Sequence, residues 1–193
     1  MNYLAHLLLS SQDDDLVIGN FIADSIRNKE VETYPLSIQQ GIFLHRQIDS
    51  YTDKHPIVLQ GTRRLYPNHG KYAPVVIDIF YDNLLTHNWE NYSDEPLSTF
   101  AERMYQLLLD RQADLPLKMQ KYIHGMIENN WLLSYGTMEG LQYAFERIER
   151  RTKFKSNFEN AVADLQKDYG LFNEEFNQFF PDVQQLVSEF CNC

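Results

Sequence analysis

The segment from Gly41 to Pro56 constrains the fold most, because its pattern is helical but polar side chains stand on the side that must be buried. On a helix over 36–54, at about 100° per residue, His45 and Asp49 lie one turn apart within an apolar stripe. An ionised carboxylate buried there alone would cost several kcal/mol, so it must be paired, protonated or bound to a cation. The stripe consists of Ile38, Gly41, Ile42, His45, Ile48, Asp49 and Thr52.

Length and composition fit one soluble domain spanning residues 1–193. The chain is 44% hydrophobic with 12 Phe and 12 Tyr, so a substantial core is expected. No run approaches the roughly 18 apolar residues of a membrane span. The beginning lacks a basic segment and soon meets Asp13, which argues against a signal peptide. The two cysteines, Cys191 and Cys193, suit neither a disulfide nor a zinc knuckle and fit a reducing cytoplasm.

The net charge of −10 argues against nucleic-acid partners, because a polyanion would be repelled unless a local basic patch intervened. Nothing in the sequence predicts a membrane partner. There is no glycine-rich nucleotide loop and no internal repeat.

Helical patterns cover almost the whole chain and predict an all-α, single-domain helical bundle. Pro35, Pro56, Pro96 and Pro116 fall near the expected helix starts, where the missing N–H does no harm. Gly136 and Gly170 fall at expected ends, and Ser156 with Glu159 has capping-box spacing. Residues 65–74 are the segment most strongly predicted to form a loop, with a turn at 68–70. We expect helices near 3–11, 14–28, 36–54, 56–66, 73–90, 97–112, 116–134, 137–150, 153–168 and 172–190.

A second helix repeats the polar pattern of the first. Within 73–90, Asp78 and Asp82 stand one turn apart on the same side as Val75, Ile79 and Leu85. Because the helix is apolar nearly all round, we expect it to lie centrally in the fold.

The inward polar groups could together hold a metal ion. His45, Asp49, Asp78 and Asp82 are joined by Asp24, one turn from Asn20, and by His6. Converging carboxylates without a cation would raise one another's pKa, and a divalent cation removes that conflict. Mixed imidazole and carboxylate ligands suit Mn²⁺, Fe²⁺ or Zn²⁺. The alternative is that these residues are hydrogen-bonded core histidines and solvated acid pairs.

Four sequence blocks, in this order within roughly the first ninety residues, resemble the acyl carrier protein phosphodiesterase family. The later half matches only in helical character and length. The blocks are Met1-Asn-Tyr-Leu-Ala-His6-Leu, Gly19-Asn-Phe-Ile-Ala-Asp24, Gly41-Ile-x-Leu-His45-Arg46-x-Ile-Asp49-x-x-Thr52-Asp53-x-His55-Pro56, and Asp78-Ile-Phe-Tyr-Asp82-x-x-Leu with Trp89.

The resemblance implies an HD-domain-like, metal-dependent phosphohydrolase. It would use Mn²⁺, with Fe²⁺ or Zn²⁺ possible, to release 4′-phosphopantetheine from holo acyl carrier protein. It does not separate metal ligands from the residues that orient them. On this basis we expect Asp24, His45, Asp49 and Asp78 as metal ligands, and His6, Arg46 and Asp82 in catalytic roles.

Two features bear on partner and activity. An acidic carrier protein needs a local basic surface, for which Arg63, Arg64 and Lys71 are the first candidate. A second candidate consists of Arg147, Arg150, Arg151, Lys153 and Lys155. Family members commonly have Asp-His where this chain has Asp82-Asn83, and asparagine is neither an acid nor an imidazole ligand. Two alternative functions therefore remain: an HD-like phosphohydrolase of a nucleotide or other small phosphoester, or a non-catalytic helical protein that binds the carrier protein.

Overall fold

The computed structural model describes residues 1–152 and 156–191, which form helices and no strand, so the all-α prediction is confirmed. None of the helices in the described part is long and apolar enough to cross a membrane. The α-helices are α1 (Tyr3–Leu9), α2 (Asp14–Ile22), α3 (Leu36–Lys54), α4 (Pro56–His69), α5 (Ala73–His87), α6 (Leu97–Asp110), α7 (Leu117–Glu128), α8 (Trp131–Ser134), α9 (Met138–Glu149), α10 (Ala161–Lys167) and α11 (Tyr169–Cys191). Short 3₁₀ turns are η1 (Ala23–Ser25), η2 (Asn28–Thr33), η3 (Gly70–Tyr72), η4 (Trp89–Asn91), η5 (Gln112–Asp114) and η6 (Phe158–Asn160).

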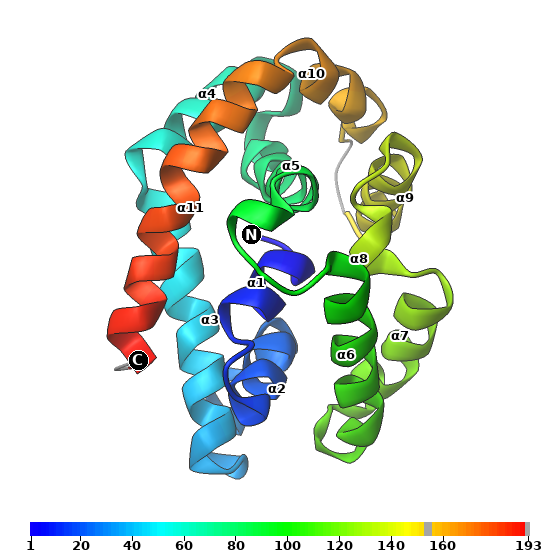
Figure 1. Cartoon of the computed structure of the whole chain (residues 1–193). Coiled ribbons are helices and arrows are strands. Elements are labelled where there is room, and N and C mark those ends of the chain that lie inside the picture. Colours follow the sequence, from blue (N-terminus) through cyan, green and yellow to red (C-terminus); the bar gives the residue numbers. More distant parts are fainter. Residues whose placement is uncertain (153–155, 192–193) are drawn as a thin grey trace.

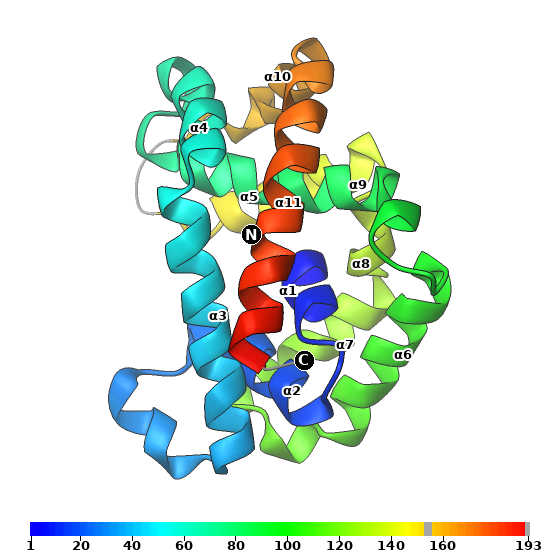
Figure 2. The same cartoon turned by 60° about the vertical axis from the view of Figure 1, so that its left-hand side comes forward.

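Helices α1 and α5 occupy the middle of the molecule, as the polar-striped second helix was expected to do. Helices α2, α3 and α11 lie on one side of them, and α6 to α9 lie on the other (Figure 1). Figure 2 shows α3 and α11 side by side along much of their length. Four fully buried rings of α11 pack inward on the core, and three of them meet α5: the Phe80–Phe172, Tyr81–Phe176 and Tyr81–Phe179 centroids are 5.3, 5.4 and 5.3 Å apart.

The closest helix pair is α2 with α3, and two glycines permit its approach. A Cβ atom on Gly19 would lie 2.1 Å from the carbonyl oxygen of Ile38 and 2.8 Å from Cα of Gly41. A Cβ atom on Gly41 would lie 2.4 Å from the carbonyl oxygen of Leu16. All three distances are far below van der Waals contact, so a side chain at either glycine would push the helices apart. This contact sets the position of the next turn of each helix.

The proline signals located helix starts correctly. Pro35, Pro96 and Pro116 are N-cap residues, and Pro56 is the first residue of α4. Helix α3 has the predicted bounds, and its buried face contains His45 and Thr52 as expected.

Four other expectations were wrong. Residues 65–69 continue α4, so His69 is a buried helical residue; only Gly70, with φ of 51°, makes a turn. The predicted helix 116–134 breaks before α8, where Asn130 takes a left-handed φ of 44°. Gly170 lies inside α11 rather than at a helix end. Ser156 does not form a capping box, because its hydroxyl donates to the Glu149 carboxylate instead. Positions 153–155 of the predicted helix 153–168 lie outside the described residues.

The glycine contact makes a prediction about stability. We expect Gly19→Ala or Gly41→Ala to lower the free energy of unfolding by about 1–3 kcal/mol or more, because the added methyl group must displace backbone atoms. Urea unfolding measures this. Gly125→Ala is the matched control, since nothing lies within 4 Å of a Cβ there and α7 should gain about 0.5–1 kcal/mol. Equal effects at positions 19 and 125 would contradict the role of the contact.

Candidate metal centre

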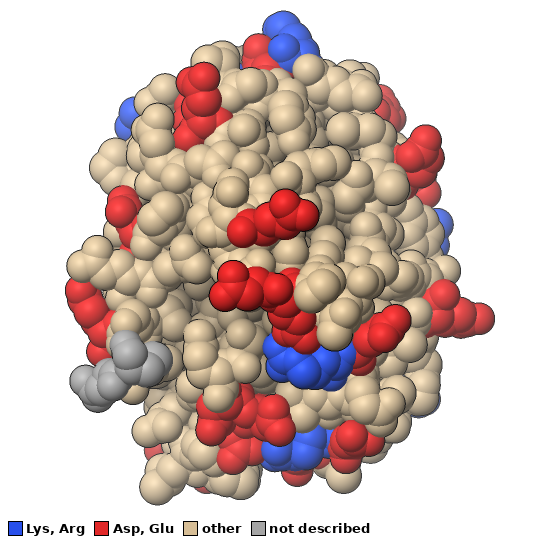
Figure 3. All heavy atoms as spheres, in the orientation of Figure 1, with Lys and Arg blue, Asp and Glu red and all other residues tan. Residues whose placement is uncertain are grey.

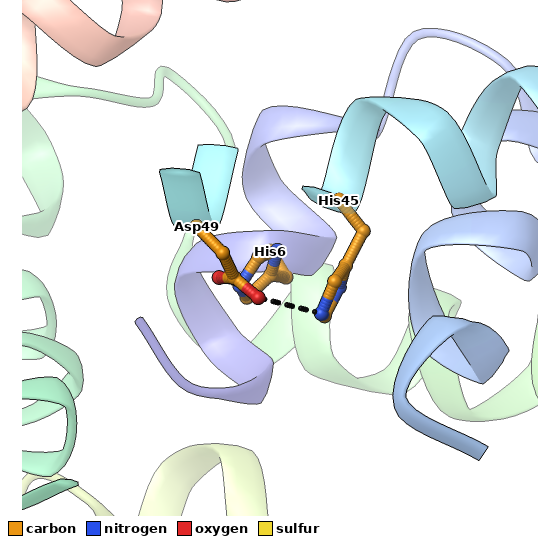
Figure 4. A group of neighbouring side chains, drawn as sticks. All are labelled: His6, His45 and Asp49. Atoms are coloured by element: carbon orange, nitrogen blue, oxygen red, sulfur yellow. Dashed lines mark hydrogen bonds and ion pairs between the residues drawn. The ribbon is translucent and has the colours of Figure 1, made fainter. Parts of the chain in front are cut away.

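Two histidines and one aspartate converge where α1 crosses α3. His6 comes from α1, whereas His45 and Asp49 come from successive turns of α3 (Figure 4). Nε2 of His6 lies 3.1 Å from Oδ1 of Asp49, and Nε2 of His45 lies 3.0 Å from Oδ2. One donor atom from each residue lies within 4.8 Å of the others, so these three residues could hold a metal ion.

Asn20 fixes the orientation of the His45 ring. Its Nδ2 donates to the backbone oxygen of His6 over 3.1 Å, which leaves its Oδ1 to accept from Nδ1 of His45 over 2.9 Å. The proton of the neutral ring is thereby placed on Nδ1, and Nε2 is presented to the carboxylates. A hydrogen bond of this kind, to the ring nitrogen that does not bind, is the usual support of a metal-ligating histidine.

His45 is strongly basic in the absence of a metal. Its Nε2 faces two carboxylates, Asp49 and Asp24, the latter with Oδ1 at 3.2 Å. Burial alone would lower the pKa of His45, but the hydrogen bonds to Asp24 and Asp49 outweigh burial and raise that pKa to about 9. Burial would likewise raise the pKa of Asp49, yet the bonds from both histidines hold it well below its ordinary value.

His6 has the opposite behaviour. Its ring stacks on that of His45 with centroids 4.1 Å apart, and its side chain is 5% exposed. Burial and the neighbouring His45 cation together lower the pKa of His6 to about 4, against the attraction of Asp49. His6 is therefore neutral at neutral pH, the protonation state that a metal ligand needs.

The donor set fits a divalent cation. Without a metal, the Nε2 atoms of two imidazoles have to share one carboxylate. A cation between the three residues would accept both Nε2 lone pairs and offset the carboxylate charge. Two imidazoles and a carboxylate suit Mn²⁺, Fe²⁺ or Zn²⁺ rather than Ca²⁺.

Asp24 lies at the edge of this group, and its side chain is 86% exposed. A hydrogen bond from His45 lowers the pKa of Asp24, so it is ionised at neutral pH. It can meet a cation or a ligand from the solvent side, and its assignment as a metal ligand stays a prediction.

Asp78 and Asp82 contact other groups. Oδ1 of Asp78 accepts from the Met1 amino group over 2.8 Å, and that nitrogen is 3.9 Å from Asp49. Asp82 is fully buried and accepts from the first-turn amides of α1, Leu4 over 2.9 Å and Ala5 over 3.2 Å. Burial raises the pKa of Asp82 to about 7 despite those bonds. Asp82 thus attaches α1, and with it His6, to α5.

A cavity of about 60 Å³ adjoins His6 and His45 and is lined in part by Met1, Asn2 and Tyr3. It has room for an ion and one or two waters but not for a nucleotide or a pantetheine arm. A larger substrate must therefore approach from the open side, where Asp24 is exposed and the Asp49 side chain is 39% exposed.

The predicted arginines lie in different surroundings. Arg46 is half-buried on α3, and no ion pair joins it to any of the described residues. Arg64 is bound by Glu175, with Nη1–Oε2 at 2.9 Å and Nη2–Oε1 at 2.5 Å, so it is already neutralised within the fold. Arg63 is exposed beside it, and Lys71 lies 5.2 Å from the Tyr72 ring.

Asn83 is part of the core. Its side chain is fully buried, and Nδ2 donates to the backbone oxygen of Tyr135 over 2.7 Å. It therefore connects α5 to the chain after α8. No hydrogen bond or ion pair joins it to His6, His45 or Asp49 in the described structure, so Asn83 does not act directly on the three candidate ligands.

The sequence predicted His6, His45 and Asp49 as site residues but did not predict all of the contacts among them and their neighbours. It placed His6 among catalytic residues, whereas the geometry groups His6 with the candidate ligands. Asn20 was noted only as a neighbour of Asp24, and the Met1 amino group was missed. Helical spacing shows that Asn20 lies one turn before Asp24, but only the packing of α2 on α3 shows that it meets His45.

Comparisons with known proteins agree over nearly the whole chain. Residues 1–183 match the family model for acyl carrier protein phosphodiesterase. A protein of that name from Photorhabdus laumondii is 29% identical over 96% of this chain and 94% of its own. Another from Pectobacterium atrosepticum is 28% identical over 97% of both chains. No solved structure matches the chain significantly, so the HD-domain likeness stays a prediction.

The two histidines should titrate far apart in metal-free protein. We expect nuclear magnetic resonance of the ring carbons to show His45 titrating near pH 9 and His6 near pH 4. Asp49→Asn should lower the pKa of His45, because burial remains after the charge is lost. The stabilisation due to His45 is complete below its unfolded pKa of about 6.5 and is lost as the pH rises through about 9. Titration of both rings near 6.5 would contradict this electrostatic description.

Metal binding provides a separate test. A divalent metal at one hundred times its dissociation constant should stabilise the protein by about 2.7 kcal/mol. His6→Ala, His45→Ala and Asp49→Ala should each abolish the melting shift caused by Mn²⁺, Fe²⁺ or Zn²⁺. His124→Ala, an exposed histidine on α7, is the control and should keep the shift. A full shift in all three site variants would place metal binding elsewhere.

Proposed function

The chain belongs to the acyl carrier protein phosphodiesterase family, and from this premise we propose that it hydrolyses the phosphodiester of holo acyl carrier protein. The products are apo carrier protein and 4′-phosphopantetheine. Water adds to phosphorus, the bond from phosphorus to the serine oxygen breaks, and that oxygen leaves with a proton. The observation that carries the proposal is the convergence of His6, His45 and Asp49 beside an open edge.

We propose that His6, His45 and Asp49 hold a divalent metal, which we assign as Mn²⁺, with Asp24 or Asp78 completing the ligand set. Bound there, the metal would act as a Lewis acid towards the phosphoryl oxygens and would activate water. The neutral state of His6 and the ionised states of Asp49 and Asp24 support this assignment.

The protein supplies orientation and charge around the phosphoryl group. Asn20 holds the His45 ring, and Asp82 holds α1, so the two histidines stay stacked. In this proposal exposed Asp24 accepts a proton from the attacking water, and Arg46 neutralises phosphoryl charge. Arg46 is half-buried on α3 next to His45, and no ion pair neutralises it among the described residues.

Two other functions compete with this proposal. The adjoining cavity of about 60 Å³ encloses neither a nucleotide nor a pantetheine arm, so its size does not separate these substrates. The family match over residues 1–183 favours the carrier protein over a nucleotide or another small phosphoester. A non-catalytic protein that binds the carrier protein was suggested by Asn83, but that side chain contacts Tyr135 and not the three ligand residues. The carrier protein phosphodiesterase therefore remains the best-supported function. A cytoplasmic location, where such a substrate is made, is part of the same proposal.

Intact mass spectrometry tests the reaction directly. Incubation of the protein and Mn²⁺ with holo carrier protein should remove the mass of one 4′-phosphopantetheine. A chelator or the Asp49→Ala variant should stop the reaction, because the metal site is lost. Asp94→Ala, at an exposed position between α5 and α6, is the control and should remain active.

Two results would reject the proposal. Unchanged carrier protein with metal bound would indicate another phosphoester as substrate. Unchanged carrier protein without bound metal would leave the non-catalytic binding protein as the function.

A further inference from the structure

Three arginines at the end of α9 differ from most others in the molecule. For Arg147, Arg150 and Arg151, no ion pair exists with any acid in the described residues, although the protein carries a net charge of −10. Most other arginines are neutralised within the fold. The neutralised pairs are Arg27–Glu30, Arg64–Glu175, Arg103–Glu95, Arg111–Asp15 and Arg111–Asp114. We name the three unpaired residues the arginine cluster.

Arg151 is connected to the candidate metal centre by two tyrosines. Its guanidinium carbon lies 5.1 Å from the centre of the Tyr122 ring. The Tyr122 hydroxyl is 3.3 Å from that of Tyr3, and the two rings are 6.1 Å apart. Tyr3 lines the same cavity as His6. The exposed Arg151 is therefore linked through Tyr122 to Tyr3, a residue of the cavity wall.

Arg147 forms the inner part of the cluster. Its guanidinium carbon lies 3.4 Å from the centre of the Trp131 ring, and its Nε and Nη1 are buried without a hydrogen-bond partner. It also contacts the Tyr135 hydroxyl, which accepts from Asn2 of the same cavity over 2.9 Å. Aromatic rings hold this cation in place and leave its charge unneutralised. Aromatic contacts thus hold two members of the cluster, Arg147 and Arg151, and tyrosines link both of them to residues of the cavity wall.

We propose that the arginine cluster is the docking surface for the acidic face of the carrier protein. The inference rests on the proposed function, and charge complementarity selects the occupant: an acidic protein can approach this acidic chain only at an uncompensated basic surface. On the face in Figure 3, acidic side chains are scattered widely and the basic ones near the middle lie against them. The earlier candidate is weaker, because Arg64 is bound by Glu175. Lys153 and Lys155, predicted with the cluster, lie outside the described residues.

Charge reversal of the two exposed members tests this proposal. Arg150→Glu/Arg151→Glu should raise KM for holo carrier protein by about tenfold or more, with kcat nearly unchanged, because docking is lost while the chemistry remains. The rise of KM with added salt should be weaker in this variant than in wild type. Turnover of bis(4-nitrophenyl) phosphate with Mn²⁺, a small diester that needs no docking, should be unchanged. Arg150→Ala/Arg151→Ala should show a smaller rise in KM and serves if the first variant fails to fold.

The matched control is Lys118→Glu/Lys167→Glu, which changes net charge equally at exposed positions on α7 and α10. It should leave KM near the wild-type value. Equal KM values for wild type and the arginine variants would overturn the docking surface and leave the proposed function standing. A similar rise in both charge-reversed proteins would also overturn it, since net charge would explain the effect. If wild type neither binds nor cleaves holo carrier protein, the proposed function fails first.

Discussion

The close approach of α2 to α3 at Gly19 and Gly41 is the constraint on which the site depends. Each glycine lies where a side chain would overlap the backbone of the other helix. Asn20 follows Gly19 directly, and His45 lies one turn after Gly41, so the contact brings amide and imidazole to 2.9 Å. A separation only slightly larger would break that hydrogen bond and release the ring. The backbone contact between these helices therefore determines how the His45 ring is oriented, and with it where Nε2 points.

Two histidines with stacked rings acquire opposite properties from their neighbours. His45 faces two carboxylates and an amide oxygen, so its protonated form is favoured. His6 shares one of those carboxylates but faces the His45 cation and is more deeply buried, so its neutral form is favoured. A divalent cation would displace the proton from His45 and take over its pairing with Asp49. In the metal-free protein, the proton on His45 Nε2 thus interacts with the carboxylates that a bound cation would otherwise contact.

The sequence predicted much of the site because the relevant residues are spaced along single helices. The i, i+4 spacing of His45 and Asp49 places both on one side of α3, and the helix has the expected bounds, but only His45 is buried there and Asp49 stays partly exposed. The spacing of residues along one helix does not show which other helix they contact. Asp82 lies one turn from Asp78, as expected, yet its oxygens accept backbone amides of α1, whose contact with α5 no periodicity reveals. The break before Trp131 was missed for a similar reason, because Asn130 adopts its left-handed conformation where Tyr105 binds its side chain.

In this proposal the reaction takes place at the small cavity, whereas the carrier protein is selected at the arginine cluster. A cavity of about 60 Å³ can enclose a metal and water but cannot recognise the shape of a pantetheine arm or a protein. Selection must then occur outside it, on surfaces that the carrier protein touches before its phosphodiester reaches Asp24. Asn83 belongs to the structure between the cavity and the arginine cluster. It joins α5 to the chain near Tyr135, and no hydrogen bond or ion pair among the described residues joins it to the candidate metal ligands. We therefore expect a substitution of Asn83 to change how α5 supports Tyr135, a residue that contacts both Asn2 at the cavity and Arg147 in the cluster.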